Sequence, residues 1–157
     1  GIALAATVDL WWLYFNVGAE RAARTFTGSN VPGRVARLAY TYLHLPIVAG
    51  IVTSAAAVEW VVAHPLGHVE PHVALAVTGG PALYLAGVAA FKRATGARWW
   101  PLSHLVGLAA LAALALAVPL LAPYQLGLTV ALMLILVAIW ETVSLRGIRN
   151  ARLEADA

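Results

Sequence analysis

Polar and ionisable residues recur inside the apolar runs of this 157-residue sequence. Ionisable groups in a bilayer-length run are costly, and they mark ion or substrate pathways by default. The alternative is an interhelical hydrogen-bond seam, because polar residues also hold membrane helices together. Both interpretations stay open for one face of the first run, which carries Asp9, Trp12, Asn16 and Glu20 at helical spacing.

The second run adds a further polar face near its start. Arg37, Tyr40 and His44 recur at helical spacing there, and Glu141 in the last run is expected at a similar membrane depth. A histidine beside a carboxylate can pass protons near neutral pH. The alternative is a structural His–Glu pair that fixes the register of the helices. The sequence predicts one buried cluster of Asp9, Asn16, His44 and Glu141.

Other histidines give weaker signals. His64, His68 and His72 are spaced by four residues, as helical zinc ligands can be. Prolines interrupt that stretch and the chain has no cysteine, so we expect a hydrated loop and no metal site or cofactor. His104 lies just after Trp99 and Trp100, and we interpret it as an interfacial residue.

Motifs of soluble enzymes are missing from the sequence. It contains no nucleotide-binding loop, no GxSxG elbow and no HExxH pair. No nucleophile stands beside a base, so we predict no catalytic residues and disfavour an enzyme. The net charge of +3 does not indicate a nucleic-acid partner, because no basic face interleaved with exposed aromatic residues is present.

The elements that must position these residues are membrane helices. The sequence is 62% hydrophobic and 11% charged, whereas soluble domains are about 45–50% apolar and about 25% charged. Continuous apolar runs predict α-helices, because a lone strand leaves its backbone unpaired in lipid. We therefore predict an all-α, polytopic transmembrane helix bundle with a single domain over 1–157 and five helices, at residues 1–17, 38–63, 73–91, 99–121 and 124–145.

Small residues in the third run indicate how the helices pack. Gly80, Tyr84 and Gly87 share a face, and small residues allow close helix contacts. We expect this packing face to contain a break at Gly79-Gly80-Pro81. The alternative is that the break exposes carbonyl groups to a cavity, as in discontinuous transporter helices.

The distribution of positive charge predicts the orientation. All 10 Lys and Arg residues fall within residues 21–37, 92–98 and 146–152. The positive-inside rule then places the first and third connections and the C-terminus in the cytoplasm. The first run is short for a full span and the chain opens inside it, so we expect upstream sequence from a longer protein.

Several segments together resemble one known family: Leu10–Asn16 (LWWLYFN), Ala19–Arg21, Tyr40–Gly50 (YTYLHLPIVAG), Gly79–Leu85 and Trp140-Glu141. This family is the bacterial low-temperature-requirement A (LtrA) family. The resemblance covers essentially the whole chain and implies a multi-spanning protein of the bacterial cytoplasmic membrane, linked by name to growth in the cold. Its usual pattern has Asp where this sequence has Asn16, which weakens a proton or cation role there.

Three functions remain as hypotheses. The first is a transporter or channel for a small solute or ion, with or without proton coupling. The others are a membrane scaffold that supports growth in the cold and a lipid-acting enzyme. In the first, Asp9, His44 and Glu141 would titrate, Asn16 and Tyr40 would orient them, and Arg37 would guard the cytoplasmic mouth. The expected partners are the lipid bilayer and either upstream helices of the same protein or a homo-oligomer.

Overall fold

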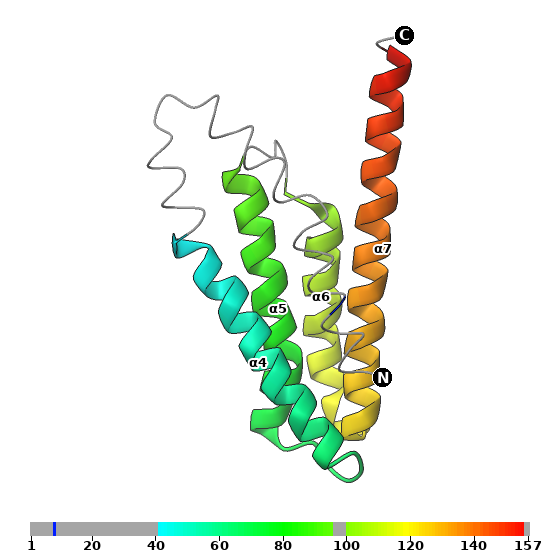
Figure 1. The fold of residues 1–157 in the computed structure, drawn as a ribbon. Coiled ribbons are helices and arrows are strands. Elements are labelled where there is room, and N and C mark those ends of the chain that lie inside the picture. The colour runs from blue at the N-terminus through cyan, green and yellow to red at the C-terminus, as the bar shows by residue number, and fades with distance from the viewer. Residues whose placement is uncertain (1–7, 9–40, 96–99, 156–157) are drawn as a thin grey trace.

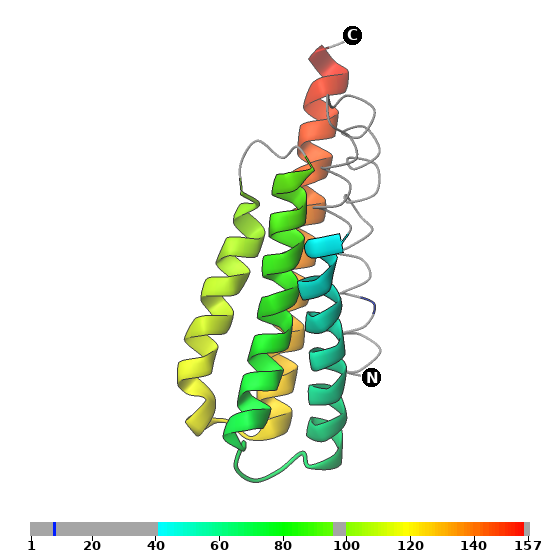
Figure 2. The same ribbon diagram turned by 90° about the vertical axis from the view of Figure 1, so that its left-hand side faces the viewer.

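The computed structural model describes residues 8, 41–95 and 100–155. These residues form α4 (His44–Ala63), α5 (Pro71–Ala94), α6 (Leu102–Ala117), the short 3-10 helix η2 (Val118–Leu120) and α7 (Pro123–Ala155). Successive long helices run antiparallel in an elongated bundle (Figures 1 and 2). No strand occurs in the described part of the chain.

The all-α prediction is confirmed for these residues. Four described helices are long and apolar enough to cross a membrane: His44–Ala63, Pro71–Ala94, Leu102–Leu120 and Pro123–Ser144. Of the first predicted helix, at residues 1–17, the structure describes residue 8 alone, so this helix stays a prediction. The helix α7 continues past its apolar span to Ala155, because Arg, Leu, Glu and Ala in that segment are good helix formers.

Helix α5 is continuous through Gly79-Gly80-Pro81, so the predicted break is wrong. Proline removes only one N–H donor from the helix, and neighbouring helices allow this loss inside membrane helices. The predicted packing face is confirmed. A Cβ atom on Gly80 would lie 2.8 Å from Oγ of Ser54, and one on Gly87 would lie 2.8 Å from Ile47 Cγ1. The small residues therefore bring α4 and α5 into close contact.

The remaining helices close the interior around α5. Tyr84 and Leu85 of α5, Leu111 of α6 and Leu126 of α7 are all almost fully buried. Large apolar side chains also cover the outside, including Leu116, whose exposed fraction is 86%. Extended exposed apolar surface marks contact with a membrane or with other protein surfaces. The bundle is therefore apolar on its inner and outer faces.

The connection between α4 and α5 is held at two points. The backbone N–H of Tyr124 donates to the carbonyl of Pro65 at 3.2 Å, and the rings of Trp60 and His64 lie 4.9 Å apart between centroids. His72 contacts the same indole ring at 6.5 Å. In the described part of the chain, no three His, Asp or Glu side chains are placed to hold a metal ion.

Replacing Gly67 in this connection with Ala should destabilise the fold by about 1–2 kcal/mol. Gly67 has a φ of 102°, which L residues rarely adopt, and a Cβ there would meet nothing within 4 Å. The loss would therefore come from backbone strain alone. Thermal unfolding in detergent measures it, with the exposed neighbour Leu66→Ala as the control. Equal melting temperatures for the two variants would contradict this account.

Candidate functional site

Three charged or titratable side chains meet inside the bundle, each from a different helix. Lys92 lies on α5, His104 on α6 and Glu141 on α7. Their exposed fractions are 4%, 0% and 7%. We refer to these three residues as the charged network. Such groups are rare inside membrane helix bundles and are functional candidates by default.

Every pair within the charged network is in contact. The ammonium of Lys92 donates to Oε1 of Glu141, and its Nζ lies 3.3 Å from Nε2 of His104. Nδ1 of His104 lies 3.5 Å from Oε2 of Glu141. The same Nδ1 atom lies 3.1 Å from Oγ of Ser103. His104 therefore contacts both members of the Lys92–Glu141 ion pair.

The contacts assign the tautomer of His104. A lysine ammonium has three N–H donors and no acceptor. Nε2 of His104 must therefore accept from Lys92, and the ring proton of the neutral imidazole stands on Nδ1. This Nδ1–H faces two acceptors, the Ser103 hydroxyl and the Glu141 carboxylate.

The ends of two helices bring these side chains together. Lys92 occupies the last turn of α5, where a cation complements the negative end of the helix dipole. Thr95 at that end donates from Oγ1 to the carbonyl of Phe91 at 2.8 Å. His104 occupies the first turn of α6, and its backbone N–H donates to the carbonyl of Pro101 at 3.1 Å. Helix α7 runs antiparallel to α6 (Figure 1), and its residue Glu141 is buried.

The electrostatics of the charged network depend on complete pairing. Moving a carboxylate and an ammonium out of water costs several kcal/mol each, and their attraction offsets this only with good geometry and further hydrogen bonds. With neutral His104, the charges of Lys92 and Glu141 cancel. Within the described residues, Oε2 of Glu141 accepts no hydrogen bond. In the charged network, Oε2 is therefore an acceptor atom that is available to a proton or to a further hydrogen-bond donor.

The structure describes two of the predicted site residues. Glu141 is buried as expected, but its ion pairs are with Lys92 and His104. His44 begins α4 and packs its ring edge-on against Phe91, with centroids 6.1 Å apart. It therefore adjoins the turn that carries Lys92. The other predicted residues lie outside the described residues: Asp9, Asn16, Glu20, Arg37 and Tyr40.

Sequence reasoning missed Lys92, His104 and Ser103 as site residues. The interpretation of His104 as interfacial is wrong, because its side chain is fully buried. The spacing of these residues from apolar residues on the same helix face could have identified Lys92 and His104 as buried. Lys92 follows Tyr84 and Val88 at intervals of four, and both of these residues are buried. His104 likewise shares its face with Gly107 and Leu111, which are also buried.

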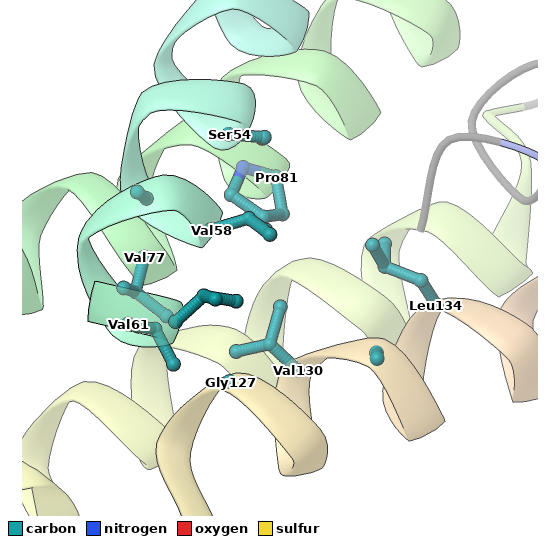
Figure 3. Close-up of a pocket in the computed structure, with 11 residues that line it drawn as sticks. Ser54, Val58, Val61, Val77, Pro81, Gly127, Val130 and Leu134 are labelled. Atoms are coloured by element: carbon teal, nitrogen blue, oxygen red, sulfur yellow. The ribbon is translucent and has the colours of Figure 1, made fainter. Parts of the chain in front are cut away.

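A separate apolar pocket lies between α4, α5 and α7 (Figure 3). Its volume is about 50 Å³, and Ser54, Val61, Pro81, Val130 and Leu134 are among its lining residues. The Ser54 hydroxyl already donates to the carbonyl of Gly50 at 2.7 Å. The pocket therefore offers apolar contacts and little hydrogen bonding. The charged network, and not this pocket, is therefore the candidate functional site among the described residues.

Four described helices are long and apolar enough to cross a membrane, and three of them contribute to the buried charged network. These features define the chain as an integral membrane helix bundle. The chain belongs to the family of the bacterial low temperature requirement A protein (LtrA), whose model matches residues 1–139. Lys92 and His104 lie within that match.

One curated relative supports the same family. It is an uncharacterized protein of Rhizobium meliloti (strain 1021), 38% identical over 145 residues. The alignment covers 92% of this chain and 35% of the relative, so the chain spans about a third of that protein's length. No solved structure matches the chain.

Proposed function

We propose that this protein is a proton-linked transporter in which Glu141 carries the proton. The observation that supports the proposal is the ion pair between Lys92 and Glu141, buried between transmembrane helices and contacted by His104. Ionisable groups in such positions form the proton relays of pumps and transporters.

Protonation of Glu141 would change the forces between the helices. The charged carboxylate attracts the Lys92 ammonium and joins α7 to α5. The protonated acid cannot maintain that ion pair, so the network would gain one net positive charge and the contact between these helices would weaken. A bundle with two such packing states can expose a path to alternate sides of the membrane.

The proposal also includes an orientation. The charged network lies at the end of the bundle where α5 ends and α6 begins. Basic residues concentrate in the connection at that end and in the segment after residue 145. By the positive-inside rule, this end of the bundle and the C-terminus lie on the cytoplasmic side of the bacterial inner membrane. Upstream helices of the full-length protein or a second copy would complete the pathway.

Proton flux into proteoliposomes tests the proposal. The full-length protein is reconstituted with a pH-sensitive dye trapped inside, and an inward proton gradient is imposed. Glu141→Gln should reduce dye acidification at least about tenfold, because the amide cannot carry the proton. Arg93→Met, an exposed neighbour of Lys92, should retain wild-type flux. Wild-type flux from Glu141→Gln would overturn the proposal.

A membrane scaffold that supports growth in the cold is the second candidate. It is favoured by one observation: the charged network is buried and its members bond to one another, as structural groups would. A scaffold would show no proton flux, while Glu141→Gln would lower its melting temperature. A lipid-acting enzyme has less support, since His104 has no exposed surface through which a lipid could reach it.

A further inference from the structure

We infer that His104 is a positioning residue that holds the Lys92 ammonium while Glu141 is protonated. The inference rests on the proposed function, and it names how the same site is regulated. A proton from the aqueous phase would add to the Glu141 carboxylate, and no other covalent bond would form or break. Among the described side chains of the network, His104 is then the one that can still accept a hydrogen bond from the buried ammonium.

The geometry supplies a second partner for Lys92. Nζ of Lys92 already lies 3.3 Å from Nε2 of His104. An ammonium has only N–H donors, so the atom facing Nζ must be a hydrogen-bond acceptor. Nε2 of His104 is an acceptor as long as the ring proton is on Nδ1. Lys92 can therefore retain a hydrogen bond without moving into another environment. Each partner that remains in place lowers the cost of keeping the ammonium buried.

The position of the incoming proton is consistent with this exchange. Oε2 of Glu141 accepts no hydrogen bond among the described residues, so a proton can add there without first breaking one. Oε2 lies 3.5 Å from Nδ1 of His104. The closer acceptor for that Nδ1–H is the Ser103 hydroxyl, at 3.1 Å. His104 therefore has a partner on both nitrogen atoms before and after protonation.

The groups packed around Glu141 come from several helices. Lys92 faces it from α5 and His104 from α6. On α4, His44 packs against Phe91, one residue before Lys92. Arg93, which follows Lys92, is exposed. Of these groups in the described part of the chain, His104 is the one that contacts both members of the ion pair.

Two substitutions separate acceptor chemistry from packing. His104→Phe keeps a planar ring of similar size but removes both nitrogen atoms, whereas His104→Gln keeps a carbonyl oxygen near the position of Nε2. Infrared difference spectroscopy of the full-length protein follows the carboxylic acid band of Glu141 against pH. Glu141→Gln identifies that band by abolishing it. In His104→Phe the band should appear about one pH unit or more lower than in wild type, and His104→Gln should restore most of the difference.

The two proposals fail in different ways. An unchanged band in folded His104→Phe, or a folded His104→Gln that behaves as His104→Phe does, would overturn the role of His104. A shifted and rescued band in a protein without proton flux would support that role and overturn transport. Should His104→Phe fail to fold, Ser103→Ala gives a second test, because it removes the acceptor for Nδ1–H. That variant should also move the band to lower pH, and an unmoved band would count against the inference.

Discussion

Replacing Lys92 with Met should lower the free energy of unfolding by about 3–5 kcal/mol, and Glu141→Met should cost a similar amount. Each substitution removes one half of a buried ion pair and leaves the other charge without that contact, since the two side chains pair inside the bundle. The double variant should recover most of this loss, because neither charge remains to be desolvated. Reversible unfolding in mixed detergent micelles gives the four free energies of the cycle.

The control for this cycle is the adjacent residue. Arg93→Met removes a positive charge from the same helix turn, but the Arg93 side chain is exposed, and surface charges contribute about 1 kcal/mol or less. Additive losses in the double variant would show that Lys92 and Glu141 do not stabilise the bundle as a pair. Recovered stability without recovered proton flux would separate the structural role of the pair from its proposed transport role.

The architecture could be predicted because the bilayer constrains it strongly. Helices must satisfy their own backbone in lipid, so apolar runs of sufficient length indicate spans directly. The start of α7 at Pro123 and the end of α4 at Ala63 agree with the predicted runs to within one residue. Glycine and proline residues inside a run were a less reliable guide to where a helix is interrupted. Gly79-Gly80-Pro81 reads as a break in isolation, yet contact with α4 keeps α5 continuous there.

The site was only partly predictable, because its members come from separate helices. Glu141 was found because a carboxylate in an apolar run is conspicuous. Lys92 stands beside Arg93, and the pair suggested a loop flank. The structure shows that the two differ, since a turn of 100° per residue buries Lys92 and exposes Arg93. The partner of Glu141 depends on helix rotation, which one sequence does not specify.

Replacing Gly80 with Ala should destabilise the bundle by about 2–3 kcal/mol, while Gly79→Ala should be neutral or stabilising by up to about 1 kcal/mol. A Cβ on Gly80 would lie 2.8 Å from Oγ of Ser54 and 2.9 Å from its backbone nitrogen. A Cβ on Gly79 would meet only Leu75 Cδ1, at an ordinary 3.7 Å. Both changes add the same methyl group to one helix, so their difference isolates the contact between α4 and α5.

Gly50→Ala should be the more severe change on the facing helix. Its Cβ would lie 2.5 Å from the Tyr84 nitrogen and 2.8 Å from the Gly80 oxygen, and backbone atoms cannot rotate away as a side chain can. The helices would have to separate, so the loss should exceed that of Gly80→Ala. The unfolding measurement used for Lys92 gives both values. Equal stabilities for Gly50→Ala and Gly79→Ala would mean that α4 and α5 are not in backbone contact. If the predicted order holds, this helix pair is a rigid frame, and the end of α5 that carries Lys92 is held against it.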